Sequence, residues 1–173
     1  MSCFKKLIIL NFGMILIWGC ADTTGVRWES SPSIGFRSND LYYASIEPII
    51  WSKGCVGFTL RIVNRSDKEL ELNWNNSFFI INGRPHGGFI FEGIDFKDIR
   101  NPRQPEVIPV NKSISKDIFP NNLVSFSDRK LGGVSYLAMS EGKKGVYLTV
   151  KAGDLQLHEK ISVRLFAIKR NDE

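Results

Sequence analysis

The sequence predicts an all-β protein, an antiparallel β-sandwich of about eight or nine strands that follows an N-terminal signal helix. Three features of the 173 residues support this prediction. Apolar and polar residues alternate along several short stretches, turn residues separate these stretches, and no stretch after the N-terminal segment has a helical pattern. Successive side chains of a strand point to opposite faces, so alternation indicates a sheet that is buried on one side.

The stretch from Val56 to Gly83 shows the alternation most clearly. Every second residue of 56–62 is apolar, and the same pattern returns at 70–74. Residues 64–68 between them include Asn, Ser and Asp, whose side chains bond nearby backbone groups and favour a turn. We therefore expect 56–62 and 70–74 to pair as a hairpin, with Trp74 filling space between two sheets.

Two further turns are expected to join neighbouring strands. The apolar run 77–81 ends at Asn82-Gly83, a dipeptide that tolerates the positive φ angles of a type I′ turn, so another strand should fold back there. Near the C-terminus, 146–150 and 155–168 should form a second hairpin.

Two other regions have strand character. Residues 41–51 should form a strand with one apolar face. Pro48 lies within it and cannot donate a backbone hydrogen bond, which indicates a sheet edge or a bulge. Residues 107–110 and 113–119 should form a further pair that turns at 111–112.

The first 20 residues have the composition of a secretory signal. Lys5 and Lys6 precede an uncharged apolar stretch at 7–18. That stretch is shorter than the ~20 apolar residues of a transmembrane helix, and a basic region followed by a short apolar region is typical of a signal peptide. The four residues that end at Cys20, IWGC, resemble the bacterial lipobox.

The resemblance to bacterial lipoproteins implies a thioether-linked diacylglycerol on Cys20, cleavage before it and usually a further acyl chain on the new amino group. This chain departs from the motif at Ile17, where leucine is commoner, and at the bulky Trp18. Ala21 stands where an aspartate would retain an enteric lipoprotein at the inner membrane, which implies the outer membrane in a host that has one. The alternative is a plain anchor helix, or a buried helix, with a chance cysteine.

The chain divides into a signal peptide at 1–19, a lipidated N-terminus and tether at 20–40, and a β-sandwich domain at 41–173. Removing the signal peptide leaves enough residues for one domain with a sizeable core. The chain has 23 Lys and Arg and 18 Asp and Glu, a formal net charge of +5, and two of these positive charges belong to the signal peptide. No basic run exceeds two residues, so the clustered basic stripe of a nucleic-acid surface is missing. Nucleic acid is not an expected partner.

Catalytic and metal-binding patterns are scarce. Cys55 is the one unmodified cysteine of the mature chain, so we expect a half-buried apolar role, with a disulfide between chains as the alternative. The spacing of His86 and His158 matches no metal motif, although a site formed in space with Cys55 stays an alternative. The serine and lysine of Ser113-Ile-Ser-Lys116 match the S-x-x-K of penicillin-recognising enzymes, which works at the start of a helix and not in a strand. We expect neither an enzyme nor a cofactor.

Residues 84–104 have the least regular pattern and form the expected binding loop. Long connections between sandwich strands often carry binding surfaces, and arginines there can bind a carboxylate or a phosphate. The candidate binding residues are His86, Glu92, Asp95, Arg100 and Arg103. The alternative is a crossover between sheets, with its phenylalanines in the core and its charged residues in solvent.

These features together predict a lipid-anchored envelope protein that acts as a non-enzymatic protein-interaction module. Its partners would be the membrane, through acylated Cys20, and an unidentified envelope protein. The alternative is a periplasmic or surface protein that binds a small ligand or a metal. Several short strands between turn signals resemble an immunoglobulin-like sandwich in architecture, although the Cys…Trp…Cys pattern of antibody domains is missing.

Overall fold

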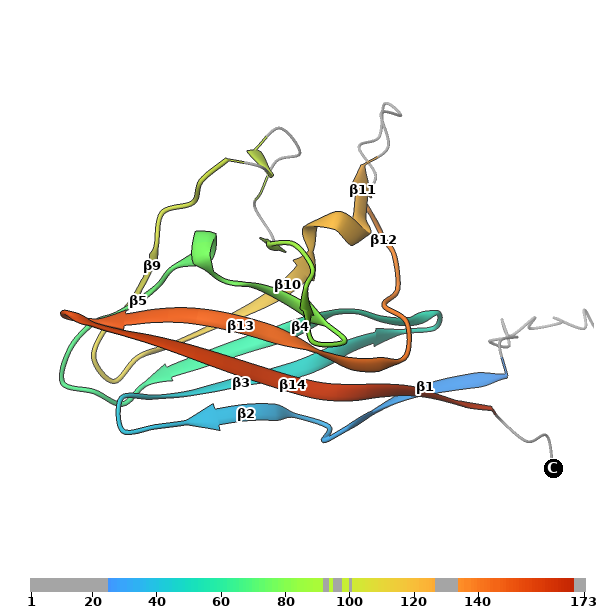
Figure 1. Ribbon diagram of the computed structural model, residues 1–173, viewed down its shortest axis with the longest axis horizontal. Coiled ribbons are helices and arrows are strands. Elements are labelled where there is room, and N and C mark those ends of the chain that lie inside the picture. Colours follow the sequence, from blue (N-terminus) through green and yellow to red (C-terminus); the bar gives the residue numbers. More distant parts are fainter. Residues whose placement is uncertain (1–24, 92–93, 95–97, 100, 127–133, 170–173) are drawn as a thin grey trace, which may run out of the picture.

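The computed structural model describes residues 25–91, 94, 98–99, 101–126 and 134–169, which form a sandwich of two antiparallel β-sheets (Figure 1). The predicted all-β, antiparallel class is confirmed. The expected signal helix and Cys20 lie outside the described residues. None of the helical segments in the described ranges is long and apolar enough to cross a membrane.

The first sheet is built around the C-terminal hairpin. Its spatial order is β1 (Val26–Ser31), β14 (Leu155–Lys169), β13 (Gly142–Ala152), β5 (Leu70–Leu72) and β9 (Glu106–Ile108). Two more strands extend it, since β6 (Phe78–Ile81) also pairs with β13, and β7 (Arg84–Pro85) pairs with β6.

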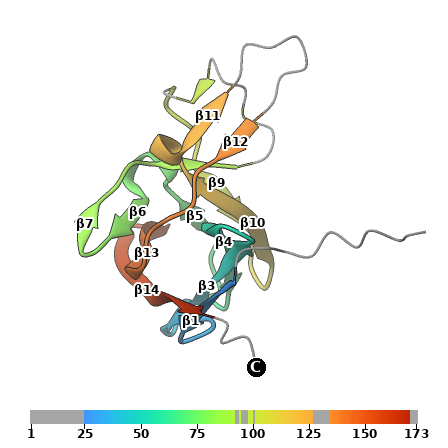
Figure 2. The same ribbon diagram turned by 90° about the vertical axis from the view of Figure 1, so that its right-hand side faces the viewer.

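The second sheet faces the first across the core, as the end-on view shows (Figure 2). Its spatial order is β2 (Gly35–Ser38), β3 (Tyr42–Trp51), β4 (Gly54–Asn64), β10 (Ser113–Pro120) and β8 (Phe89–Ile90). A separate two-stranded ribbon is formed by β11 (Val124–Phe126) and β12 (Val134–Tyr136). Fourteen strands are thus described where eight or nine were expected, because six of them have only two or three residues and leave no alternation to read.

The apolar faces of the two sheets meet in one core. Phe58 of β4 and Phe79 of β6 stack across it with ring centroids 5.8 Å apart. The alternation predicted for 56–62 is confirmed, since residues 56, 58, 60 and 62 are all buried. Each buried side chain of this size contributes about 1.5–3 kcal/mol relative to an exposed one.

The expected hairpin between 56–62 and 70–74 was wrong. β4 pairs with β3 and β10 in the second sheet, whereas β5 pairs with β13 and β9 in the first. The chain therefore crosses between the sheets after Asn64. The pair expected from 107–110 and 113–119 was wrong for the same reason, because β9 and β10 lie in different sheets. Alternation shows which face of a strand is apolar, but not which strand lies beside it.

The side chain of Asn64 connects these two crossovers. It is 1% exposed, and its Oδ1 accepts hydrogen bonds from the backbone N and the Oγ of Ser66, at 2.9 and 2.8 Å. Its Nδ2 donates to the carbonyl oxygens of Lys68 (2.7 Å), Ile108 (2.9 Å) and Pro109 (3.2 Å). One buried amide is thus hydrogen-bonded both to the segment that follows β4 and to the segment that leads from β9 to β10.

The predicted tight turns are confirmed. Asn82 and Gly83 join β6 to β7 with φ angles of 50° and 84°, as a type I′ turn requires. The hairpin of β13 and β14 closes at Gly153, whose φ is 59°. Pro48 lies just beyond the paired part of β2 and directly before a bulge at residues 49–50.

The sheets begin earlier than residue 41. β1 pairs with β14 and β2 pairs with β3, so both strands fall within the stretch expected to be a tether at 20–40. The boundary at 41 was therefore set too late, since the first described strand of the sandwich already begins at Val26. Both strands are half-exposed at a sheet edge, which leaves only a weak hydrophobic pattern in the sequence.

Candidate functional site

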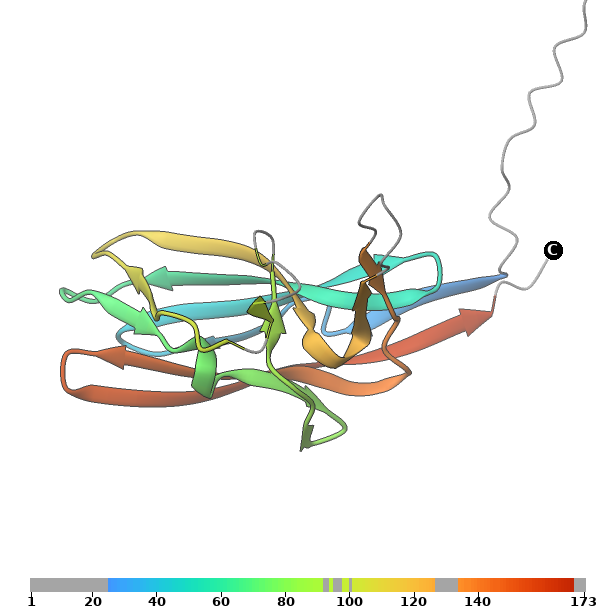
Figure 3. The same ribbon diagram turned by 90° about the horizontal axis from the view of Figure 1, so that it is seen from above.

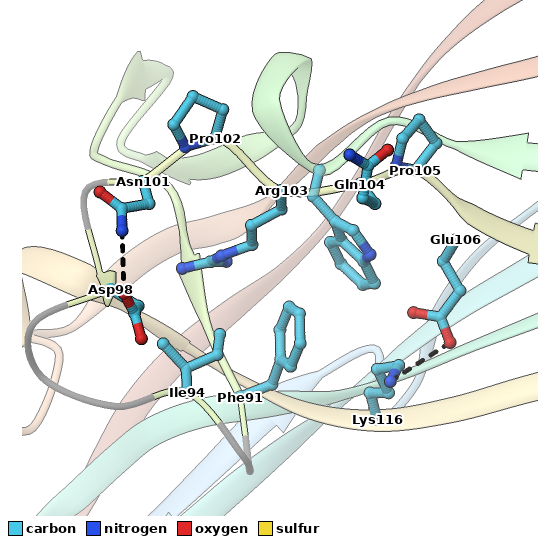
Figure 4. Close-up of a pocket in the computed structure, with 11 residues that line it drawn as sticks. Phe91, Ile94, Asp98, Asn101, Pro102, Arg103, Gln104, Pro105, Glu106 and Lys116 are labelled. Atoms are coloured by element: carbon cyan, nitrogen blue, oxygen red, sulfur yellow. Dashed lines mark hydrogen bonds and ion pairs between the residues drawn. The ribbon is translucent and has the colours of Figure 1, made fainter.

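A cavity of about 560 Å³ opens beside β10, between the turn after β5 and the chain that leads into β9. Its wall includes Trp74, Phe91, Arg103, Glu106 and Lys116 (Figure 4). We call it the Arg103 cavity. A second cavity of about 710 Å³ shares Trp74 and Arg103 with it and continues toward Gly88 and Asn121.

Aromatic rings form the apolar part of the Arg103 cavity. Trp74 begins the 3₁₀ turn η1 (Trp74–Asn76), which the preceding Asn73 caps by accepting hydrogen bonds from two backbone N–H groups, at 3.0 and 3.1 Å. The indole is only 4% exposed, and its ring centroid lies 5.8 Å from that of Phe89 and 4.8 Å from that of Phe91. Phe91 is half-buried and continues this aromatic cluster to the cavity wall.

Arg103 lies over this aromatic cluster. Its guanidinium carbon is 5.0 Å from the centroid of the Phe91 ring, and its Nη1 donates a hydrogen bond to the carbonyl oxygen of Phe89. Burial lowers the pKa of Arg103. An arginine nevertheless stays charged at neutral pH, so the cavity wall contains a permanent cation with further donors.

The backbone at Arg103 is held by the side chain of Asn75. Asn75 Oδ1 accepts a hydrogen bond from the Arg103 N–H at 2.8 Å, and Asn75 Nδ2 donates to the Arg103 carbonyl at 2.7 Å. The amide thus pairs with Arg103 as a neighbouring strand would. Pro102 and Pro105 flank this point and fix their own φ angles, which reduces the backbone freedom that the segment loses when a ligand binds.

A second cation approaches the same ring. Lys116 Nζ is 5.0 Å from the Phe91 centroid and 3.2 Å from Glu106 Oε1. Asp98, the other described carboxylate of the cavity, accepts a hydrogen bond from Asn101 Nδ2 at 2.8 Å. Figure 4 shows the guanidinium and the ammonium on two sides of the Phe91 ring.

Of the five predicted binding residues, the structure brings one to the cavity. Arg103 lines both cavities, whereas Glu92, Asp95 and Arg100 lie outside the described residues. His86 is half-buried between β7 and β8, and its backbone N–H donates to Phe79 O at 2.7 Å. In the part of the chain that the structure describes, His86 contributes to the wall of neither cavity.

Sequence reasoning missed most of the cavity. The core position expected for Trp74 is confirmed by its burial, but its contribution to a cavity wall was not predicted, and Lys116 was noticed only as part of a chance motif. The alternative interpretation of 84–104, a crossover between the sheets, agrees with the structure, since the chain runs from β7 in the first sheet to β8 in the second and returns to β9. Its Phe89 is buried, but Phe91 extends into the cavity wall. No local pattern indicates Asn75, which lies 28 residues from Arg103.

The surroundings of Cys55 and His158, the other chemically reactive side chains, indicate structural roles. Cys55 is fully rather than half buried, its Sγ donates to Gly57 O at 3.2 Å, and burial raises the pKa of the thiol to about 11. His158 Nδ1 lies 3.2 Å from Thr149 Oγ1, which in turn donates to Asn76 O at 2.9 Å. Among the described residues, no three His, Cys, Asp or Glu side chains are grouped to hold a metal ion.

Comparisons of this chain with protein-family models, with curated proteins and with solved structures found no match.

Proposed function

We propose that this protein is a lipid-anchored envelope lipoprotein that binds another envelope protein through the Arg103 cavity and catalyses no reaction. The observation that carries the proposal is the arrangement of Arg103, held in place by Asn75, over the aromatic rings of an open cavity. The lipobox-like residues that end at Cys20 support the anchor.

The cavity suits a peptide segment that presents a carboxylate next to an apolar side chain. A guanidinium offers a planar fork of donors that matches the two oxygens of a carboxylate, and such charge-assisted bonds are the stronger ones. The indole of Trp74 and the ring of Phe91 supply apolar surface beside it. Buried aromatic and arginine side chains carry most of the binding energy in protein interfaces.

The surroundings of the reactive side chains support a non-enzymatic role. The raised pKa keeps the Cys55 thiol protonated at neutral pH, and a thiol is a much weaker nucleophile than a thiolate. The hydroxyl of Thr149 beside His158 is buried and already donates to a backbone carbonyl. Neither group lines the Arg103 cavity in the described part of the chain.

Lysine-directed cross-linking in intact cells, followed by affinity capture and mass spectrometry, tests the proposal. We expect one dominant envelope protein joined through Lys116, and about tenfold less of it with Arg103→Met, because the loss of a charge-assisted bond costs about 1.5–3 kcal/mol. Arg164→Met removes the same charge from an exposed position on β14 and is the matched control.

Two outcomes would count against this function. If Arg103→Met captures as much partner as the wild type, and the cross-links run through lysines of β14, the protein binds a partner but not through the Arg103 cavity. Capture of no envelope protein would refute the interaction module itself.

A second candidate is a receptor for a small anionic molecule, and the size of the cavity favours it. Small-molecule sites commonly enclose about 300–1,000 Å³, and the Arg103 cavity lies within that range at about 560 Å³. A ligand that binds only the folded state must raise the melting temperature. Benzoate and phenyl phosphate are suitable probes, and a melting temperature that stays constant with both would rule out this class of ligand.

A further inference from the structure

Exposed apolar side chains gather at the end of the sandwich where the chain enters the first strand. Trp51 is 49% exposed and Leu137 56% exposed, values that are high for residues of their size. Val26 and Ile50 are also exposed at this end. We call these four residues the entry face. Ile168 is exposed as well, but it lies opposite Arg27 in the β1–β14 register and therefore faces the other side of the sheet from Val26.

Separate elements bring the entry face together. The start of β1 pairs with the end of β14, which places Val26 opposite Lys169. The turn between β3 and β4 reaches the same end, where a Cβ on Gly54 would lie 3.2 Å from the Trp28 ring and 3.1 Å from Ala138. Trp51 packs edge-on against Tyr136 at 5.5 Å. Figures 1 and 3 agree that this turn, the start of β1 and the end of β14 share one end of the molecule.

Basic side chains border the entry face. Arg27, Lys53 and Lys169 are all exposed there. Arg27 Nη2 lies 3.0 Å from Glu29, and Glu141 Oε1 accepts a hydrogen bond from the backbone N–H of residue 167 at 2.8 Å. Among the described residues, Glu29 and Glu141 near this end are thus engaged locally, while Lys53 is exposed at the turn and Lys169 on the last strand.

The proposed anchor lies within a short reach of the entry face. Only residues 21–25 separate Cys20 from Val26. An extended chain covers at most ~3.3–3.6 Å per residue, so the start of β1 stays within ~20 Å of the acylated cysteine. The interfacial region of one leaflet is itself several ångströms thick, since a bilayer measures ~40–45 Å against ~30 Å for its hydrocarbon core. Such a short tether keeps this end of the domain, and no other, within ~20 Å of the proposed anchor.

We propose that the entry face docks on the surface of the lipid bilayer, with Trp51 and Leu137 in the interfacial region and the basic residues against anionic headgroups. This inference rests on the proposed anchoring through Cys20. An indole combines an apolar ring with a polar N–H and is enriched at membrane interfaces. A basic residue near an anionic surface strengthens binding about fivefold. Docking fixes the orientation of the domain, so the Arg103 cavity is presented away from the end that meets the lipid.

Quenching of tryptophan fluorescence by brominated lipid tests this docking. The full chain is produced with its signal in bacterial cells, purified from membranes and reconstituted into phosphatidylcholine vesicles that contain phosphatidylglycerol and brominated phosphatidylcholine. We expect strong quenching in the wild type, loss of most of it in Trp51→Phe, and no loss in Trp74→Phe, which removes a tryptophan from the Arg103 cavity. Lys53→Ala should weaken the quenching in anionic vesicles and leave it unchanged in vesicles of phosphatidylcholine alone.

Flotation of the same vesicles separates docking from anchoring. Protein that floats with the vesicles, but is quenched equally in the wild type and Trp51→Phe, would overturn the docking and leave the anchor intact. Cross-links between the Lys53 residues of two molecules, without quenching of Trp51, would show that a second copy covers the face instead. Protein that does not float would overturn the anchor of the proposed function and the docking together.

Discussion

Two asparagine side chains form hydrogen bonds with the backbone of distant segments, and the two sets of bonds have different consequences. Asn64 is buried and connects the two crossovers between the sheets. Asn75 is exposed and bonds both backbone groups of Arg103. An asparagine amide can imitate a peptide group because it has one acceptor and two donor hydrogens. The Asn64 amide links the two crossovers between the sheets. The Asn75 amide holds the backbone of Arg103, whose guanidinium lines the cavity.

The difference shows how burial decides what a polar contact contributes. A buried donor or acceptor that loses its partner costs its full desolvation, whereas an exposed one regains water. Asn64 should therefore matter mainly for stability, and Asn75 mainly for the geometry of the Arg103 cavity. Substitutions at both asparagines and at the buried side chains of Lys144 and Tyr42 test this division.

Replacement of Asn64 by alanine should lower the free energy of unfolding by about 3 kcal/mol, because the buried Ile108 carbonyl and the groups of Ser66 lose their partner. Urea unfolding followed by tryptophan fluorescence measures this. A loss below about 1 kcal/mol would show that the crossovers are held by other contacts.

Replacement of Asn75 by alanine should lower stability by only about 1 kcal/mol, because its two hydrogen bonds lie at the surface. If the proposed envelope partner binds at the Arg103 cavity, the same change should reduce its capture about tenfold, because Arg103 then has to be ordered during binding. Parallel unfolding and capture measurements check both parts. Equal capture by Asn75→Ala and the wild type would separate Asn75 from recognition.

Lys144 offers a buried cation for comparison with Arg103. It is fully buried on β13, and its Nζ donates to Glu141 O at 2.9 Å. Burial lowers its pKa, so between the folded value and the ordinary lysine value near 10.5 the unfolded state holds more protons. The free energy of unfolding should therefore rise with pH across that interval.

Urea unfolding of the wild type and Lys144→Met over a pH series tests this expectation. The wild type should gain stability relative to the variant as the pH rises. The pKa of Cys55, raised to about 11 by burial, acts in the opposite direction, since its stabilisation is lost above the ordinary thiol value near 9.0. The Lys144 charge lowers this pKa, so Lys144→Met should lose more stability through Cys55 than the wild type does, which adds to the same difference. Lys143→Met alters the exposed neighbour and should give a curve parallel to the wild type. A constant difference between wild type and Lys144→Met would contradict the lowered pKa.

The smallest change in stability is expected for a substitution of Tyr42, which lies opposite Asn64 in the β3–β4 register. Its hydroxyl is buried and has no hydrogen-bond partner among the described residues, and burial raises the pKa of Tyr42. Tyr42→Phe should therefore leave stability unchanged or raise it by up to about 1 kcal/mol. A clear destabilisation in urea would mean that the hydroxyl is bonded after all.

The class of the fold and its local turns could be predicted from the amino-acid sequence alone. Alternation at 56–62 identified buried faces because burial acts on each residue separately, and Asn82-Gly83 identified a turn because its backbone angles depend on two residues alone. The lipobox resemblance at Cys20 is equally local and remains a prediction. The prediction of Arg103 as a candidate binding residue came from its position in an irregular loop, and the structure places it in a cavity wall.

Which strands are neighbours, and which side chains surround Arg103, depends on the packing of the whole chain and could not be predicted from local patterns. The apolar faces of β4 and β5 satisfy the same pattern whether the strands pair edge to edge or pack across the core, and the packing of the whole chain chooses between these arrangements. The pairing of β5 with β9 then brings Asn75 to Arg103, and the pairing of β10 with β8 completes the cavity with Lys116. These contacts join residues far apart in the chain, so no local pattern could encode them.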